Sequence, residues 1–529
     1  MHSPLFPSTR SRGGRWAAVA AGVTVVALAL GGCAAADNSP SATESATPVS
    51  GGTLTFARTA AVTSLDLHTE ITANNAFAID KIFEPLLTFD AEGAIQPAVA
   101  SEYSQSDDGL TWTFTIRDGI TFSNGEAVTP ADVVFSLNRH ITTENSPLPL
   151  NAPITDIVAE GDNTVVVTLS SPYTPFAAEL AGFANGILPA DLAGQSPEEF
   201  FANPIGTGPF VVDSWEQGGE ISFVKNENYW QDGKPYVDKL VYTLVPDDNQ
   251  LVAQLTGGQV DAIDEVPEAN VADLEANPAI SVVSTDSWNV EELFFNNLDE
   301  HFADRNVRRA IALAIDKEGI VEATSFGTAK VAGSLLPPSI EYYTEDIDTL
   351  SLDLDKAKDE IAQSAFPDGF ETTLLVASGN TLRAQAAQAI QQQLAPLGIT
   401  VNIESIDLAA FRARFRAFDY EFMLNGATSD TPDPNSIISF QADPDAGTNA
   451  YWTHYSNDEV TALLHEGTAL PEGDEREATY TQIQELIAQD APYVPLSYPA
   501  AIKGTSSNVH DFVVLPNGST RLQDAWIEQ

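Results

Sequence analysis

Apolar and polar residues alternate with two different periods along most of the chain. A period of two places Leu54 and Phe56 on one face of an expected strand over residues 53–58. The same signal predicts further strands at residues 110–122, 164–170, 210–215, 220–225, 239–245 and 292–297. Helical periods and start signals predict helices at residues 76–83, 129–139, 176–180, 307–324 and 475–488. Strands and helices that alternate in this way are typical of an α/β protein.

Two local signals indicate how neighbouring elements connect. Gly218-Gly219 separates two of the expected strands and has the composition of a hairpin turn. Further along, a strand over 372–377, a helix over 382–394 and a strand over 400–405 follow one another with short connections. Strand, helix and strand at this spacing form a βαβ unit, so we expect the two strands to pair in parallel.

The N-terminus has the pattern of a secretion signal. Arg10, Arg12 and Arg15 precede an uncharged run over 16–30, which is shorter than the roughly 20 apolar residues of a membrane span. The run leads into Leu-Gly-Gly-Cys, which resembles the lipobox of bacterial lipoproteins. Cys33 is the only cysteine of the chain, so it forms no intramolecular disulfide and no cysteine-based metal site. We therefore expect Cys33 to carry a lipid.

Charge and length narrow the classes of protein that this chain represents. The sequence has 24 Lys and Arg against 75 Asp and Glu, a formal net charge of −51. Such acidity argues against a nucleic-acid partner, because that role needs a basic surface to neutralise phosphates. The chain has 529 residues, which is too many for a single hydrophobic core and sufficient for two large lobes.

The sequence contains no recognisable catalytic or metal-binding motif. The chain has no nucleophile elbow, phosphate loop or His-Glu-x-x-His, and no two histidines have the spacing of a helical metal site. The histidines are scattered at positions 2, 68, 140, 301, 454, 465 and 510. We therefore assign no catalytic residue, metal or cofactor, while a histidine cluster built from distant segments stays open.

Three stretches resemble the motifs of one known family. They are Glu84-Pro85-Leu86-Leu87, residues 111–139 (TWTFTIRDGITFSNGEAVTPADVVFSLNR) and residues 203–210 (NPIGTGPF). On these motifs the chain is identified as a member of extracellular solute-binding protein family 5, the peptide- and nickel-binding branch of the ABC importers. The resemblance implies an α/β, two-lobe fold of the type II periplasmic-binding-protein kind, with an extra subdomain in the first lobe and a ligand cleft between the lobes.

The same resemblance implies where the ligand is held. Residues 425–436, NGATSDTPDPNS, are similar to the family segment G-W-x-x-D-x-x-D-P, in which the first aspartate holds the α-ammonium of a bound peptide. Gly426 matches the glycine, Asp430 the ammonium-binding aspartate and Asp433-Pro434 the closing pair. Ala427 replaces the tryptophan of the motif. From local chemistry alone, the segment is a turn.

Two neighbouring residues join Asp430 and Ala427 in the predicted ligand site. Ser429 precedes the aspartate, and Trp288 is expected where the hinge meets the cleft, as an apolar wall or as core. Dipeptide-binding members also carry an arginine for the ligand carboxylate just before the helix that here contains Arg383. Residues 374–380 contain no arginine, which argues against strict dipeptide specificity and favours longer peptides or another amine-bearing solute.

A separate cluster of arginines, at positions 412, 414 and 416, is unusual in so acidic a chain. Arg412 and Arg416 share a face of the expected helix. We favour a solvated or ion-paired face over a ligand clamp.

These inferences predict a division of the chain into consecutive regions. The regions are a lipoprotein signal peptide at 1–32, a disordered tether at 33–52, a first lobe at 53–285 with an inserted subdomain at about 90–200, a second lobe at 286–490, and a return to the first lobe at 491–529. The tether assignment follows from its Ala, Ser, Thr and Pro content, which offers too little apolar surface to fold.

We expect a monomeric, membrane-anchored binder that delivers a peptide or peptide-like solute to an ABC permease and ATPase complex. A nickel-chelate binder of the same family is the first alternative. A secreted hydrolase of peptides or glycans is a less favoured one, and turnover of substrate would identify it. An inert adhesion or structural lipoprotein is a third, and it would show no ligand-dependent thermal shift.

Replacing Cys33 with alanine is expected to abolish lipidation, because no other thiol can accept the lipid. The variant should be released or left unprocessed, as measured by fractionation of cells into membrane and soluble material. A variant that fractionates with membranes as fully as the parent would contradict the lipoprotein assignment.

Overall fold

A computed structural model describes residues 47–69, 72–144, 146–347, 349–446 and 449–528. Cys33, the predicted signal peptide and most of the predicted tether lie outside the described residues. The chain divides into the units Met1–Thr47 and Pro48–Gln529, and all described helices and strands belong to the second unit.

The first lobe is built around the central strand β1 (Thr53–Arg58). β1 pairs in parallel with β10 (Lys239–Leu244) and β11 (Ala262–Ile263). β10 then continues in antiparallel fashion to β9 (Ile221–Lys225) and β8 (Phe210–Trp215). The predicted strands 53–58, 210–215, 220–225 and 239–245 and the predicted hairpin are confirmed.

The second lobe is built around β13 (Asn289–Phe295). β13 pairs with β17 (Phe422–Thr428), which continues to β15 (Glu371–Ala377) and β16 (Thr400–Ile406). β15 and β16 are parallel, and α10 (Thr381–Leu394) connects them. The predicted βαβ unit is therefore confirmed.

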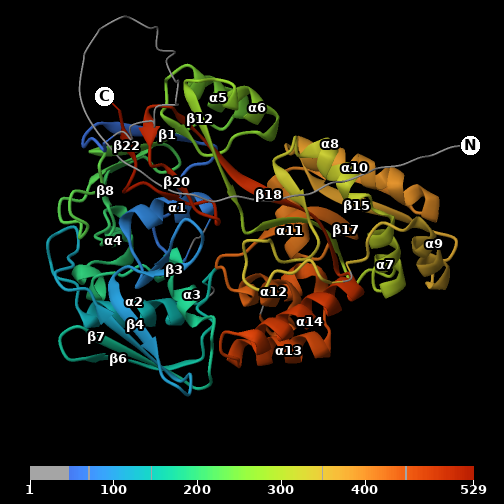
Figure 1. The fold of residues 1–529 in the computed structure, drawn as a ribbon, viewed down its shortest axis with the longest axis horizontal. Coiled ribbons are helices and arrows are strands. Elements are labelled where there is room, and N and C mark those ends of the chain that lie inside the picture. Colours follow the sequence, from blue (N-terminus) through green and yellow to red (C-terminus); the bar gives the residue numbers. More distant parts are fainter. Residues whose placement is uncertain (1–46, 70–71, 145, 348, 447–448, 529) are drawn as a thin grey trace, which may run out of the picture. The chain divides into compact units, whose positions relative to one another are not determined.

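One long strand, β18 (Tyr493–Ser506), belongs to both lobes. Its first residues pair with β13 and with β14 (Ala329–Val331), and its last residues pair with β11 and β12 (Ile280–Asp286). Figure 1 shows this strand, in red, running from one lobe to the other. The two lobes therefore share one continuous 12-stranded sheet.

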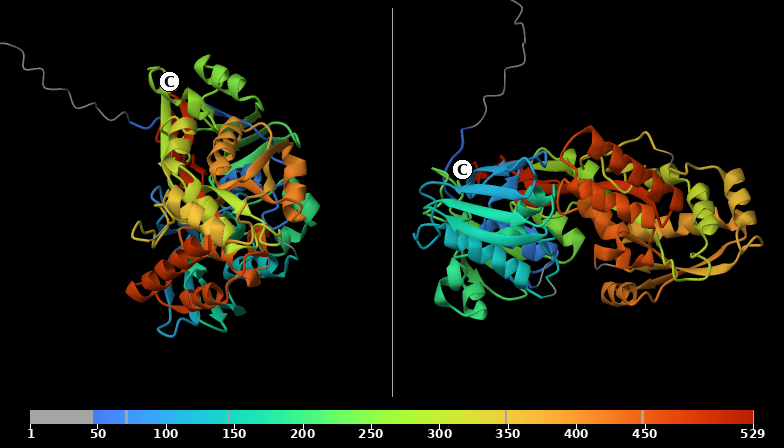
Figure 2. Two further views of the ribbon diagram at one scale, coloured as in Figure 1. Left: turned by 90° about the vertical axis from the view of Figure 1, so that its right-hand side faces the viewer. Right: turned by 90° about the horizontal axis from the view of Figure 1, so that it is seen from below.

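A second, four-stranded sheet is inserted in the first lobe. Its antiparallel order is β4 (Ala100–Gln105), β5 (Thr111–Ile116), β7 (Thr164–Leu169) and β6 (Ile154–Glu160). Alternate residues of β5 and β7 are buried, so only one face of the sheet is covered. α2 (Pro130–Thr142) packs against β6 and β7, and the right-hand view of Figure 2 shows this layer in cyan.

The remaining elements surround the two sheets. The other helices are α1 (Ala73–Ile82), α3 (Phe176–Leu180), α4 (Pro197–Ala202), α5 (Asp248–Thr256), α6 (Val271–Glu275), α7 (Arg305–Ala314), α8 (Lys317–Thr324), α9 (Leu354–Gln363), α11 (Leu408–Arg416), α12 (Pro434–Ala442), α13 (Asp458–Ala469) and α14 (Asp474–Asp490). The short strands are β2 (Leu87–Phe89), β3 (Ile95–Pro97), β19 (Val509–His510), β20 (Val513–Val514), β21 (Thr520–Arg521) and β22 (Trp526–Ile527). Among the described helices, none has both the length and the apolar composition needed to cross a membrane.

One predicted helix is wrong. The expected single helix over 307–324 is two helices, α7 and α8, because Ile315 has an extended backbone. The side chain of Asp316 accepts a hydrogen bond from the Gly319 N–H at 2.9 Å and so starts a new helix. The apolar period continues across the break, and periodicity alone therefore did not show it.

The motif at residues 203–210 lies against the last turn of α1. A Cβ atom at Gly206 would be 2.0 Å from the carbonyl oxygen of Ile82, and one at Gly208 would be 2.6 Å from backbone atoms of Lys81 and Ile82. The Gly208 N–H donates a hydrogen bond to the Ile82 carbonyl at 2.8 Å. Only glycine permits this approach of two backbones.

Gly206→Ala is expected to destabilise the protein by about 3 kcal/mol or more, because its Cβ would overlap a backbone oxygen that cannot move without shifting α1. Denaturation of the purified protein followed by circular dichroism measures the effect. Gly333→Ala is the matched control, since a Cβ there meets no atom within 4 Å. Equal midpoints for the two variants would contradict the close packing.

Candidate ligand-binding site

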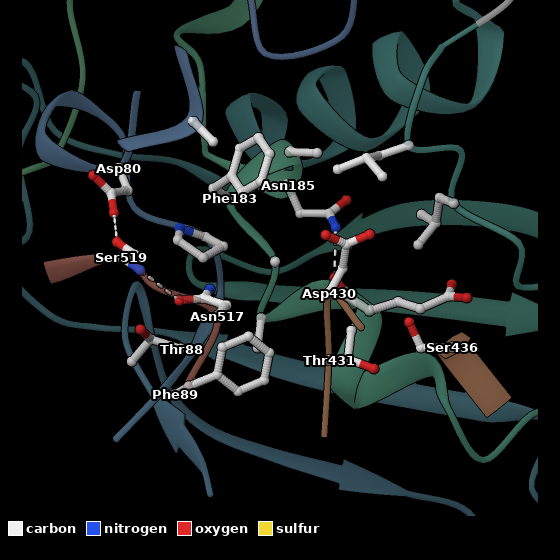
Figure 3. Close-up of a pocket in the computed structure, with 18 of the residues that line it drawn as sticks. Asp80, Thr88, Phe89, Phe183, Asn185, Asp430, Thr431, Ser436, Asn517 and Ser519 are labelled. Carbon is white, nitrogen blue, oxygen red and sulfur yellow. Dashed lines mark hydrogen bonds between the residues drawn. The ribbon is translucent and has the colours of Figure 1, made fainter. Parts of the chain in front are cut away.

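A cavity of about 830 Å³ lies between the two lobes (Figure 3). The first lobe lines it with parts of α1, the segment 83–89, the loop 147–151 and the residues around α3. The second lobe contributes residues of the turn before α12, of α12 itself and of α13, and the C-terminal segment contributes residues between 515 and 523. This volume is in the range of small-molecule binding sites.

Asp430 faces this cavity from the turn between β17 and α12. The turn is held on both sides of the aspartate: Ser429 N–H donates to the Trp288 carbonyl at 3.0 Å, and Ser429 Oγ donates to the Thr431 carbonyl at 2.7 Å. Asp433 then caps α12. Figure 3 shows the Asp430 carboxylate in the cavity wall next to Thr431.

The environment of Asp430 opposes its negative charge. Its side chain is accessible, but the surface it exposes belongs to the cavity wall. Burial in the surrounding protein raises the pKa of Asp430 from 3.8 to about 6, and no neighbouring charge offsets this effect within the described ranges. The carboxylate is therefore suited to a positively charged partner that enters the cavity.

The other predicted ligand residues lie behind the wall. Trp288, Ala427 and Ser429 are buried, and none of them lines the cavity. The Trp288 ring contacts the edge of Phe89, with ring centroids 5.3 Å apart, and Phe89 does line the cavity. These three residues therefore support the wall from behind. Ala427 pairs with Val290 in the ladder of β13 and β17, and Trp288 and Ser429 bond to each other just beyond its end.

Asp433 differs from Asp430 in having a buried arginine as its partner. Its carboxylate accepts two hydrogen bonds from Arg476 Nη2, at 2.9 and 2.7 Å, and one from the Asn435 N–H at 2.8 Å. Both charged side chains are almost completely buried. Asp433 thus starts α12 and ties it to α14.

Glu84 is a partly buried acid of the cavity wall that sequence reasoning did not assign. It accepts hydrogen bonds from Tyr229 Oη and Trp230 Nε1, both at 2.8 Å. Burial raises the pKa of Glu84 to about 7, although these two hydrogen bonds oppose the rise. The Glu-Pro-Leu motif contains this residue, but its role depends on partners about 145 positions away.

Glu179 is a second acid of this kind, on α3. It accepts hydrogen bonds from Tyr173 Oη at 2.6 Å and from Asn151, through the side-chain amide at 3.2 Å and the backbone N–H at 3.1 Å. Burial raises the pKa of Glu179 to about 7. Both Glu84 and Glu179 therefore have partners in the protein, in contrast to Asp430.

Two basic residues, Lys81 and Arg521, also line the cavity. Lys81 is buried and forms an ion pair with Asp80 at 2.7 Å. Arg521 donates from Nη2 to Thr88 Oγ1 at 2.8 Å and to the Phe89 carbonyl. Sequence reasoning missed both, because neither lies in a recognisable motif.

The arginines of α10 and α11 lie outside the cavity wall. Arg383 forms a two-pronged ion pair with Glu291, with both distances 2.8 Å, and does not line the cavity. Arg414 pairs with Glu404 at 2.8 Å, while Arg412 and Arg416 are exposed. The preference for a solvated or ion-paired face over a ligand clamp is therefore confirmed.

Asp443, Asp445 and His465 form a cluster at another part of the cavity wall. One ligand atom from each lies within 4.8 Å of the others. Asp443 is the C-cap of α12 and its Oδ2 is 3.4 Å from His465 Nε2 on α13. Imidazole and carboxylate donors together suit a divalent transition metal. The sequence did not reveal this cluster, because its members come from separate helices.

The lobes also touch each other at one side of the cavity. Thr174 of the first lobe donates from its N–H to the Thr468 carbonyl at 2.8 Å and from Oγ1 to the Leu470 carbonyl at 2.6 Å. Both acceptors lie at the C-terminal end of α13 in the second lobe. The neighbouring residues Tyr173 and Pro175 line the cavity, so this contact holds its walls together.

The fold and cavity together define a two-lobe binding protein of the type II periplasmic kind, with its ligand site between the lobes. Residues 94–449, more than half of the chain, match the model of the bacterial extracellular solute-binding proteins, family 5. The chain belongs to this family, whose members are the solute-binding components of ABC transporters.

Individual relatives agree with this assignment. The chain is 29 % identical over 452 residues to heme-binding protein A of Haemophilus influenzae, covering 80 % of this chain and 82 % of the relative. It is 27 % identical over 456 residues to the glutathione-binding protein GsiB of Salmonella typhimurium, covering 84 % and 88 %. The structure of the periplasmic binding protein DppA from Helicobacter pylori with the peptide STSA superimposes with a TM-score of 0.80 at 29 % identity, covering 91 % of this chain and 99 % of that one.

Asp430→Asn is expected to stabilise the unliganded protein at neutral pH. A carboxyl whose pKa rises from 3.8 to about 6 on folding binds more protons in the folded state, so stability falls as pH rises from about 4 to about 6. The asparagine variant lacks this fall. Its melting temperature should match the parent below pH 4 and exceed it at pH 7.5.

Asp433→Asn is the control for this experiment. It leaves the buried Arg476 without its main partner, so it should lower the melting temperature at pH 7.5. A melting temperature of Asp430→Asn below that of the parent at pH 7.5 would show that the Asp430 charge has a stabilising partner in the protein.

Proposed function

We propose that this protein is the lipid-anchored, extracytoplasmic solute-binding component of an ABC importer, and that it captures short peptides or peptide-like solutes by their free amine. The observation that carries the proposal is the Asp430 carboxylate, which faces the interlobe cavity without a cationic partner in the described ranges. The lipid anchor is Cys33, and the partners are a permease and its ATPase.

An amine fits this carboxylate for a physical reason. A peptide α-ammonium supplies the missing positive charge and donates a charge-assisted hydrogen bond. Enclosure between the lobes strengthens the interaction, because water competes for it less than at a surface. The relative that is named for binding glutathione and the similar structure that contains the peptide STSA support a peptide-like solute.

The proposed mechanism is a clamp that closes on the solute. β18 crosses from one lobe to the other and provides a continuous connection about which the lobes can rotate. Open and closed forms exchange, and a solute that contacts both lobes favours the closed form by its higher affinity for it. The hydrogen bonds of Thr174 to the end of α13 then form part of the closed contact.

The division of the chain into regions is part of this proposal. We place the first lobe at residues 53–285, with its inserted subdomain at about 90–200, the second lobe at 286–490 and the return at 491–529. Two features support it: the sheet β4–β7 lies within the inserted region, and β12 and β13 pair with different parts of β18.

A metal chelate is the second candidate solute. The cluster of Asp443, Asp445 and His465 favours it, because these donors line the same cavity and could complete the coordination of a chelated divalent ion. The two candidates depend on different residues, Asp430 for the amine and His465 for the metal.

Asp430→Ala is expected to weaken binding of a peptide by roughly 30-fold to several thousandfold, because truncating one partner of an enclosed charge pair costs about 2 to 5 kcal/mol. N-acetylation of the peptide should cost a similar amount with the parent and little more with the variant, since both changes remove one contact. Isothermal calorimetry on the co-purifying peptide, identified first by native mass spectrometry, measures both effects.

Ser436→Ala is a matched control, because Ser436 also lines the cavity but carries no charge. It should change affinity much less than Asp430→Ala does. If Asp430→Ala binds the native solute as tightly as the parent, the amine is not held there. Loss of binding in His465→Ala alone would favour the chelate instead.

A further inference from the structure

We propose that Arg521 binds the carboxylate of the solute whose amine is held by Asp430. This inference rests on the proposed peptide-like function and adds a second anchoring residue to the site. The segment just before α10, where dipeptide binders of this family carry the arginine for that group, has none in this chain. A zwitterionic peptide therefore needs another cation, and the cavity wall offers one.

Arg521 has its charge available on the cavity side. It lies on β21 and lines the cavity. Its Nη2 donates to Thr88 Oγ1 and to the Phe89 carbonyl, which are neutral acceptors. These bonds fix the orientation of the guanidinium without neutralising it. Over the described ranges, Arg521 has no carboxylate within ion-pair distance, unlike the arginines at positions 383, 414 and 476.

Two other basic residues near the site, Lys81 and Arg383, form ion pairs with acids of the protein. Lys81 is buried against Asp80 and also donates to the Thr520 carbonyl. Arg383 is bound by both oxygens of Glu291 and lies off the cavity wall. Of the two basic residues Lys81 and Arg521, Arg521 is thus the one whose hydrogen bonds in the described structure go to neutral groups only.

The positive charge of Arg521 acts on the carboxylate of Glu84. The arginine lowers the pKa of Glu84, though less than the hydrogen bonds of Tyr229 and Trp230 do. Those two bonds occupy one oxygen of Glu84 each. Glu84 and Arg521 form no ion pair in the described structure, and the guanidinium remains open to a carboxylate that enters the cavity.

Asp430 and Arg521 belong to different lobes. Asp430 follows β17 of the second lobe, whereas Arg521 is bonded to β2 and follows β20, whose Val514 packs in the core of the first lobe. A zwitterion that reaches both residues connects the lobes with charged contacts at each end. Such a solute binds the closed form better than the open form, which is the requirement for ligand-driven closure.

The test compares peptides that differ only at the C-terminus. Equimolar libraries of tetrapeptides with a free N-terminus, one with free carboxylates and one with C-terminal amides, are offered together to purified protein, and retained peptides are counted by mass spectrometry. The parent should retain the acids about 10-fold to 100-fold over the amides, the value of a hydrogen-bonded charge pair.

Three variants test whether Arg521 causes the preference for peptide acids over peptide amides. Arg521→Gln should reduce the ratio of acids to amides to about one, and Arg521→Lys should leave an intermediate ratio, because lysine keeps the charge without the planar fork. Arg414→Gln removes the same charge far from the cavity and should retain the parent's ratio. The ratio is measured within one variant, so a general loss of stability from releasing Thr88 does not change it.

The outcomes separate this inference from the function on which it rests. A parent that retains acids and amides equally, or an Arg521→Gln variant that keeps the parent's ratio, overturns the role of Arg521 and leaves peptide binding intact. A parent that retains neither library while a different solute co-purifies overturns the peptide function, and the role of Arg521 with it.

Discussion

A close contact between two backbone segments is the constraint on which the cavity depends. Gly206 and Gly208 press against the end of α1 with no room for a side chain. This contact positions the residues that follow α1, and Phe83, Glu84 and Pro85 all line the cavity. Pro209, which follows Gly208 and directly precedes β8, also lines the cavity. A motif without reactive groups thus shapes the binding site.

The balance of charge within the cavity differs from the strong net negative charge of the chain as a whole. The protein carries a formal charge of −51, yet most acids of the cavity wall have partners. Asp80 has Lys81, while Glu84 and Glu179 accept hydrogen bonds that compensate part of their burial. Asp430 is left with burial as the sole influence on its pKa. The proposed selectivity for an amine therefore rests on one uncompensated group and not on the overall acidity.

The proposed closure depends on the strand that connects the two lobes. β18 pairs with strands of both lobes, and Thr174 bonds to the second lobe at the far side of the cavity. Trp288 adds an apolar contact between them through Phe89, so that one hydrophobic cluster includes residues of both lobes. In the proposed mechanism, a solute between the lobes adds to these contacts. Solutes with a charged group at each end then favour the closed form.

The sequence by itself determined most of the elements, because side-chain periods and turn residues act locally. The βαβ unit β15–α10–β16 and the hairpin β8–β9 needed nothing beyond neighbouring residues. The break between α7 and α8 was missed because a capping aspartate overrode a continuous apolar period. Asp430 was located through its resemblance to a family motif and lies in the cavity wall.

Only the tertiary structure decided which other side chains accompany Asp430. Trp288, Ala427 and Ser429 are buried behind the wall, at or next to the end of the ladder that joins β13 to β17. The cluster of Asp443, Asp445 and His465 joins separate helical segments, and Arg521 belongs to the C-terminal segment. No local pattern could reveal these groups, because their proximity and their free or compensated charges arise only when the two lobes and the C-terminal return meet around one cavity.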